Sequence, residues 1–268
     1  MHPSAELAES LRAAVGGDGR VWALAGWDEL EAALHRAPPS VVAFVDPFLG
    51  EEAGTPAPRL LHLLNDVRSA ILVAAFPIGA GTLRHLERMV RAGLADVVDV
   101  GREDTPAALR QRLIAVRRRS VAKLLDRALP RSTPSRTRAL LSAAAETAAA
   151  GEGAAEFAAA LGATERTVLR WCRRADLPHP RRLLAWLRVL LAADMLDDPG
   201  RPLSVIARAC GYSGDAALRN ALRSFLGSPP GALRGQAFSA AASAFARELF
   251  ALREEAAARG RPDRTWLH

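Results

Sequence analysis

The first half of the chain alternates short apolar runs with amphipathic stretches. Runs rich in β-branched residues and bounded by Gly, Pro or Asp predict strands at Val21–Ala25, Val41–Val45, Ile71–Phe76 and Val97–Val100. Helical periodicity fills the stretches before and between them, at Ala5–Val15, Asp28–His35, Pro58–Ser69 and Thr82–Arg91. Continuous apolar strands separated by helices are typical of a parallel sheet covered on both faces. The pattern therefore predicts an α/β domain.

Two helix starts can be read from capping residues. Asp28 with Glu31 has the spacing of a capping box. Thr105 followed by Pro106 predicts a helix that runs without a breaker to Leu129. Its apolar residues recur at three- and four-residue steps, and part of this stripe should pack on the sheet. The remainder spans too few heptads to decide whether this helix, or the N-terminal domain as a whole, forms a homodimer.

The clearest break in the pattern is the segment 129–138, which combines two prolines with small polar and basic residues. Beyond it the strand signal vanishes, Ala and Leu dominate, and the spacing is helical. The sequence thus predicts an α/β domain at 1–128, a linker at 129–138, an all-α domain at 139–236, and a C-terminal helix and tail at 237–268. The last helix is expected at about Phe238–Ala258.

Positive charge is concentrated in the all-α region. Residues 1–128 hold 16 basic and 16 acidic side chains, whereas residues 129–236 hold 15 basic and 9 acidic ones. A basic domain beside a neutral one favours a polyanionic partner for the basic one, most often nucleic acid. A solvated arginine-rich face is the alternative that charge alone leaves open.

Composition excludes several classes of protein. Half of the residues are apolar and 24% are charged, which is typical of a globular chain. No apolar run approaches the ~20 residues of a membrane span, and the first residues do not have the pattern of a signal peptide. The two cysteines are too few for a disulfide framework or a zinc site. We expect a cytoplasmic protein that is not an enzyme, with no metal or other cofactor and no membrane partner.

A first helix-turn-helix unit can be read around Gly162. A helix ends at this glycine, the chain turns through Ala163, and a second helix follows from Thr164 to Arg174. Such a unit needs a small residue where its helices cross, here Ala158, and apolar anchors on the inner face of the second helix. The outer face of that helix is rich in arginine, whose guanidinium group can bind guanine edges and phosphates in the major groove.

The same pattern recurs 49 residues later, at Gly211. The supporting helix begins near Leu203, Ala207 stands at the crossing, and the presenting helix is Asp215–Leu226. Between the two units, Pro180–Leu196 predicts a long apolar helix that would hold them rigidly apart. A single match to this motif is only moderately specific, but two joined by one helix are far more so.

At these residues the sequence resembles the AraC-type DNA-binding domain, over about Ala139–Gln236. The resemblance rests on Gly211-Tyr212, on the 16-residue step to Gly227, and on Gly227-Ser228-Pro229-Pro230 ending in Leu233-Arg234. It departs from the family at Leu218 and Leu222, where Phe is usual, and at Asp176, where Gly is usual. Asp215 and Ala216 are poor binders of phosphate or guanine.

The resemblance implies a sequence-specific transcription regulator that lays two helices into successive major grooves of double-stranded DNA. The residues expected at the DNA are Thr164, Arg166, Thr167, Leu169, Arg170, Arg173, Arg174, Asp215, Ala216, Arg219, Asn220 and Arg223. RNA polymerase is a further partner to consider for such a regulator.

The N-terminal domain is similar, less specifically, to the receiver domain of two-component regulators, which has a flavodoxin-like fold. Asp46 ends a strand where that family has its phospho-accepting Asp. The acidic pair that would hold Mg²⁺, the hydroxyl residue and the Lys of that family have no counterparts here. We therefore interpret the domain as a degenerate receiver used for sensing, docking or dimerisation, and Asp46 as a strand-end turn residue rather than a phosphorylation site.

Two alternatives remain beside a DNA-binding regulator. The first is a protein-interaction scaffold whose DNA-binding domain is vestigial, which the residues Asp215 and Ala216 motivate. The second is a small-molecule enzyme that uses Asp46 near the carboxyl ends of the strands, where such sheets bind ligands. Cys172 and Cys210 are expected to be small core residues.

Overall fold

The computed structural model describes residues 2–38, 41–50, 56–67 and 69–258. The chain divides into two compact units, one formed by Met1–Ser120 with Asp198–Ile206 and the other by Val121–Asp197 with Ala207–His268. The predicted domain boundaries stay predictions, and residues 259–268 of the predicted tail lie outside the described part of the chain.

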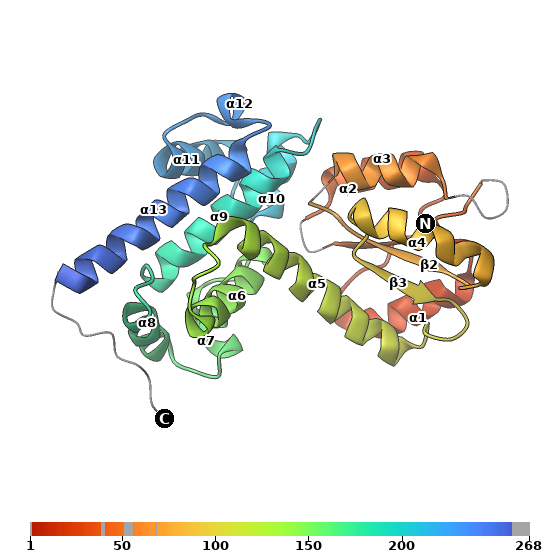
Figure 1. Ribbon diagram of the computed structural model, residues 1–268, viewed down its shortest axis with the longest axis horizontal. Helices are drawn as coiled ribbons and strands as arrows, with labels where there is room; N and C mark the ends of the chain where they lie inside the picture. The colour runs from red at the N-terminus through yellow and green to blue at the C-terminus, as the bar shows by residue number, and fades with distance from the viewer. Residues whose placement is uncertain (1, 39–40, 51–55, 68, 259–268) are drawn as a thin grey trace. The chain divides into compact units, whose positions relative to one another are not determined.

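The first unit is built on a three-stranded parallel sheet (Figure 1). Strands β1 (Val42–Val45), β2 (Ile71–Phe76) and β3 (Asp96–Asp99) lie side by side in chain order. Val42 is paired with Ile71, and Val73 with Asp96. The three strands confirm the predicted runs at Val41–Val45, Ile71–Phe76 and Val97–Val100 to within one residue at each end.

Helices cover both faces of this sheet. They are α1 (Ala5–Val15), α2 (Trp27–Arg36), α3 (Pro58–Asp66), α4 (Ala80–Arg91) and α5 (Pro106–Ala128), with a short 3₁₀ helix, η1 (Gly16–Asp18), after α1. Leu72, Ala74 and Phe76 of β2 pack into one core with α2, α3 and α4. The alternate residues Ile71, Val73 and Ala75 pack into a second core with α1 and α5. The sequence prediction of a sheet buried on both faces is confirmed.

Two local predictions for this unit are wrong. Val21–Ala25 is not a strand, and Trp22 within it is 66% exposed. Helix α2 begins one residue earlier than expected because Trp27 packs against the core, and its N-cap is Gly26. The predicted capping box of Asp28 and Glu31 is therefore absent, and the carboxylate of Glu29 accepts the backbone N–H of Ala25 instead (2.8 Å).

Helix α5 begins as the sequence predicts. The Thr105 hydroxyl accepts the N–H of Ala108 (3.4 Å), and Leu109, Leu113 and Val116 pack on the sheet. Further along the same stripe, Leu124 is buried in the chain as well. Dimerisation through this helix stays a prediction.

A segment from later in the chain, Asp198–Ile206, clusters with the α/β unit. Asp198 and Arg201 are almost fully buried there and form an ion pair (3.1 Å). Arg201 also donates to the carbonyl of Ala37 (3.0 Å), and Asp198 accepts the hydroxyl of Ser69 (2.5 Å). Buried charges need such partners, because an unpaired charge in the interior is strongly destabilising.

The second unit is helical in its described part, as predicted for the region after the linker. Its helices are α6 (Ser135–Ala149), α7 (Ala154–Ala160), α8 (Glu165–Arg174), α9 (Pro180–Leu196), α11 (Asp215–Leu226), α12 (Pro230–Leu233) and α13 (Ala237–Ala258). Helix α10 (Leu203–Ala209) is divided, because its residues up to Ile206 cluster with the first unit and those from Ala207 with the second. Helix α9 is buried along most of its length and contacts α6, α7, α8, α11 and α13. It is the central helix of this unit (Figure 1).

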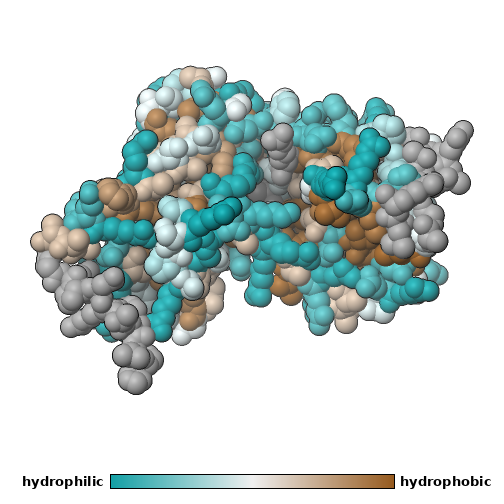
Figure 2. All heavy atoms as spheres, viewed as in Figure 1, coloured by the Kyte–Doolittle hydropathy of each residue, from teal (hydrophilic) through white to brown (hydrophobic). Residues whose placement is uncertain are grey.

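The described helices include none that is both long enough and apolar enough to span a membrane. On the face drawn in Figure 2, hydrophilic side chains cover much of the surface of each unit.

Candidate nucleic-acid interface

The turn of the first helix-turn-helix unit is formed by backbone geometry around Gly162. This residue has φ of 61°, a left-handed conformation in which an L side chain is strained. The next N–H, that of Ala163, donates to the carbonyl of Ala158 five residues earlier (3.0 Å). This bond satisfies a carbonyl at the end of α7 and redirects the chain into α8. Ala158 is buried at 3% exposure, as expected for a small residue where two helices cross.

The second helix-turn-helix unit repeats this turn. Gly211 has φ of 75°, and the N–H of Tyr212 donates to the carbonyl of Ala207 (2.8 Å). Each of the three positions lies 49 residues after its counterpart in the first unit. The sequence prediction of two matching turns is therefore confirmed in backbone hydrogen bonds.

Helix α8 is fixed by a cap at its start and by apolar residues on its inner face. The Thr164 hydroxyl accepts the N–H of Thr167 (3.2 Å), so it serves as the N-cap. Val168 and Cys172 are buried. Burial raises the pKa of the Cys172 thiol to about 11, which keeps it protonated and apolar at neutral pH.

The opposite face of α8 carries the predicted arginines. Arg166 and Arg170 are exposed and lie four residues apart, so they project from the same side of the helix. Arg173 and Arg174 are exposed in the last turn. The helix therefore presents four guanidinium groups against the single carboxylate of Glu165.

Helix α11 has the same division into an inner and an outer face. Leu218 and Leu222 are fully buried, so they fill the core positions where the resembling family has Phe. The exposed residues are Ala216, Arg219, Asn220, Arg223 and Ser224. The outer face differs from that of α8 because Asp215 forms an ion pair with Arg219 (3.8 Å) across one helical turn.

Both presenting helices end in a left-handed residue, but only the second uses glycine. Asp176, just after α8, has φ of 51°, and Gly227, just after α11, has φ of 73°. The N–H of Leu177 donates to the carbonyl of Cys172 (2.9 Å) across the first of these ends. Aspartate is among the few residues that tolerate this conformation. The departure from glycine at position 176 therefore preserves the turn.

Helix α9 runs between α8 and α11 and contacts both (Figure 1). Trp186, 2% exposed, packs edge-to-face against Phe225 of α11, with 4.6 Å between ring centroids. Arg188 donates to the carbonyl of Glu152 (2.6 Å) and so joins α9 to the start of the first unit. At the far end, the carboxylate of Asp197 accepts the backbone N–H groups of Ala237 and Phe238 (2.8 and 3.0 Å). These contacts fix both helix-turn-helix units on helix α9.

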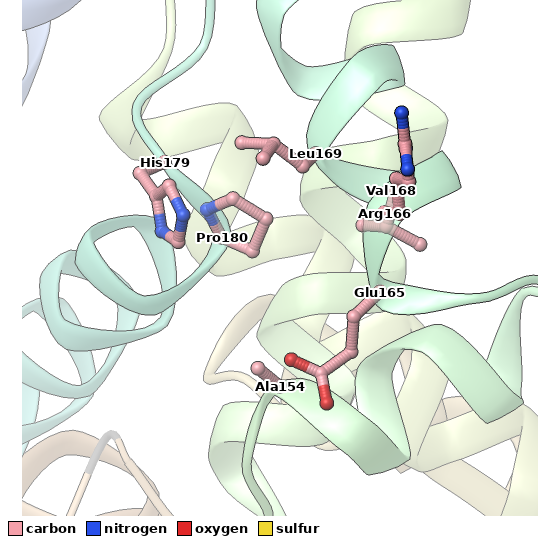
Figure 3. A pocket seen from close by; sticks show the side chains of 7 residues that line it. All are labelled: Ala154, Glu165, Arg166, Val168, Leu169, His179 and Pro180. Atoms are coloured by element: carbon pink, nitrogen blue, oxygen red, sulfur yellow. The ribbon is translucent and has the colours of Figure 1, made fainter.

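A shallow pocket of about 160 Å³ lies beside the first half of α8. In Figure 3, Leu169 points toward Pro180 and His179, whereas Glu165 points toward Ala154. Leu169, which the sequence places at the DNA, is thus half-buried against the start of α9. His179 joins this surface although the sequence analysis did not select it. Its position depends on how α9 packs, and no local motif marks it.

The carboxyl ends of the strands were the other region with predicted chemistry. Asp46 follows β1, and its side chain accepts the N–H of Phe48 (2.9 Å), the geometry of a turn residue. Across the described ranges, no group of three or more His, Cys, Asp and Glu side chains has the arrangement of a metal site.

Comparison with known families supplies the final observation on the helical unit. Residues 157–236 match the sequence model of a family described as a helix-turn-helix domain. No curated protein and no solved structure matches the chain. The matched residues begin in α7 and end after α12, and they contain both turns and both presenting helices. Residues 157–236 are therefore an AraC-type helix-turn-helix domain, and this match supports, at the family level, a DNA-binding transcription regulator.

Proposed function

We propose that this protein is a sequence-specific transcription regulator that inserts α8 and α11 into successive major grooves of one DNA duplex. The observation that carries the proposal is the repetition of one turn geometry in a single helical unit, with an exposed polar helix after each turn. Successive major grooves on one face of B-DNA lie about 34 Å apart. A buried helix such as α9 is suited to hold two reading helices at a constant separation.

The charge of α8 supports contact with a polyanion. Its arginines at positions 166 and 170 stand at four-residue spacing, where like charges repel and cost a few tenths of a kcal/mol. A nucleic-acid backbone would relieve this repulsion. Each arginine that neutralises a phosphate releases counterions, so we expect DNA affinity to fall steeply as salt concentration rises.

The test is selection from a random-sequence duplex library by the purified full-length chain. The proposal predicts enrichment of a site with two conserved blocks about one helical turn apart. The salt dependence of affinity for the enriched duplex should be steep, and a scrambled duplex should bind far more weakly.

A second candidate is a protein-interaction scaffold with a vestigial DNA-binding domain. The ion pair of Asp215 with Arg219 favours it, because it places a carboxylate on the face that would meet DNA and occupies an arginine. Recovery of no enriched sequence, even at low salt, would support the scaffold and contradict the regulator.

For the α/β unit we propose a role in sensing, docking or dimerisation that does not use phosphorylation. Its parallel strands follow one another in chain order, as the later strands of a receiver-like fold would. The side chain of Asp46 is engaged by the N–H of Phe48. Incubation with acetyl phosphate should leave the mass of the protein unchanged, whereas a phosphorylation abolished in Asp46→Asn would contradict this proposal.

A further inference from the structure

The outer faces of α8 and α11 carry different hydrogen-bonding groups. On α8, Arg166 and Arg170 are exposed, and neither forms an ion pair with another described residue. On α11, Ala216, Asn220 and Arg223 are exposed, and the exposed Arg219 forms a surface ion pair with Asp215 (3.8 Å). The two helices are therefore equipped to read different bases.

The groups on α8 match guanine. The guanidinium of arginine presents two parallel N–H donors, and guanine presents two acceptors, N7 and O6, at its major-groove edge. Because Arg166 and Arg170 lie one turn apart on one face, they can reach neighbouring base pairs. Leu169 lies between them in sequence but packs toward His179 and Pro180, so it does not stand between the two arginines as a further exposed side chain (Figure 3).

The groups on α11 match an A·T pair better than guanine. The amide of Asn220 can donate to N7 and accept from the N6 amino group of adenine, and the methyl group of Ala216 suits the methyl group of thymine. Asp215 adds a carboxylate that repels phosphates and can accept only from an amino group such as that of cytosine. It also partly offsets the positive charge of Arg219, with which it forms a surface ion pair.

We propose that the DNA site is divided into two unlike halves, a guanine-containing half read by Arg166 and Arg170 and an A·T-containing half read by Asn220. The α8 half contributes most of the discrimination between sequences. This inference rests on the proposed function and adds to it the base chemistry of each half of the site.

The experiment uses the duplex enriched by selection and replaces single bases with analogues. Substituting 7-deazaguanine removes the N7 acceptor of guanine without changing base pairing. In the α8 half this should weaken binding of the wild-type chain at one position, by less than the roughly 5- to 150-fold value of a whole bidentate contact, because O6 remains as an acceptor. The Arg170→Ala variant should bind the natural and the substituted duplex equally at the base that Arg170 reads.

Two further variants complete the test. Arg247→Ala removes an exposed arginine from α13 and should keep the full sensitivity to 7-deazaguanine, which controls for loss of charge alone. Asn220→Ala should lose sensitivity to 7-deazaadenine in the other half of the site. Because all three side chains are exposed, circular dichroism should show unchanged folding for each variant.

The outcomes separate this inference from the proposed function. An enriched site without guanine in either half would contradict the proposal that the two halves differ in this way. An Arg170→Ala variant that still distinguishes 7-deazaguanine at every position would contradict it as well. Neither outcome would contradict the proposed function as a DNA-binding regulator. Failure to enrich any site would contradict the proposed function itself, and the inference with it.

Discussion

The two helix-turn-helix units have the same backbone and unlike surfaces. In both, a glycine with positive φ follows the supporting helix, and the next N–H donates to the carbonyl of an alanine five residues earlier. In the first unit the exposed helix then carries four arginines and one acid, whereas in the second it carries two arginines, one of them paired with Asp215.

This difference separates what determines the fold from what determines the function. The turns depend on Gly162 and Gly211, and the helices are held by buried residues such as Val168 and Leu218. The side chains of Val168 and Leu218 lie on the inner faces of α8 and α11, away from the surface that would meet DNA. The exposed residues are free of packing constraints, so the two units can keep one geometry and diverge in what they bind.

The largest effect is expected from removing a buried anchor. Leu222→Ala should lower the free energy of unfolding by about 2–5 kcal/mol, because it leaves a cavity where the fully buried leucine side chain packs. Urea denaturation followed by circular dichroism measures the change. The adjacent exposed variant Arg223→Ala should stay within about 0.5 kcal/mol of the wild type. Equal losses in the two variants would show that the inner and outer faces of α11 are wrongly assigned.

The next effect distinguishes the reading helices. Arg170→Ala should weaken binding to the selected site by about 1–3 kcal/mol, because one bidentate contact to a base is lost. Arg219→Ala should cost less, since Asp215 already offsets the charge of that arginine. Fluorescence anisotropy titrations at one fixed salt concentration compare the two. A greater loss of affinity for Arg219→Ala than for Arg170→Ala would show that α11 contributes more to binding than α8.

A smaller gain is expected from removing the acid on α11. Asp215→Asn should tighten binding to every duplex by roughly 0.3–1 kcal/mol, because a carboxylate that repels phosphate is lost at the start of an exposed helix. The gain should shrink at high salt. Weaker binding by this variant would indicate that Asp215 orients Arg219 productively or contacts a base itself.

Small and opposite effects are expected at the ends of the two presenting helices. Asp176→Gly should raise the free energy of unfolding by about 0.5 kcal/mol, because glycine relieves the left-handed strain but loses more entropy on folding. Gly227→Ala should act in the opposite direction by about 1 kcal/mol, since it creates that strain. Thermal unfolding of both variants measures the two signs. Destabilisation by Asp176→Gly would show that the aspartate side chain itself stabilises the turn.

The sequence was most informative where one residue type has one structural use. Gly162 and Gly211 predicted both turns, and the apolar runs at Val41–Val45 and Ile71–Phe76 predicted buried strands, because such runs need cover on both faces. The same reasoning failed at Val21–Ala25. That run is β-branched only at Val21, and it contains the exposed Trp22 and pairs with no strand in the described sheet.

The candidate site was predictable by helix face but not by contact. Spacing alone separates Arg166 and Arg170 from the buried Val168, because the helical period is known. It does not predict that Leu169 lies against His179 and Pro180, since this depends on the packing of α9 beside α8. Nor does spacing decide whether Asp215 pairs with Arg219 or remains solvated, because surface ion pairs are worth little energy.

Hydroxyl-radical footprinting of the full-length chain on its selected duplex tests most directly whether both helices engage one DNA molecule. Two reading helices in successive grooves predict two protected stretches on one face of the duplex, with centres about 10 base pairs apart. Asn220→Ala should weaken protection in one stretch and Arg170→Ala in both, since α8 contributes most of the binding. A single protected stretch, or protection on opposite faces, would contradict reading by a pair of helices.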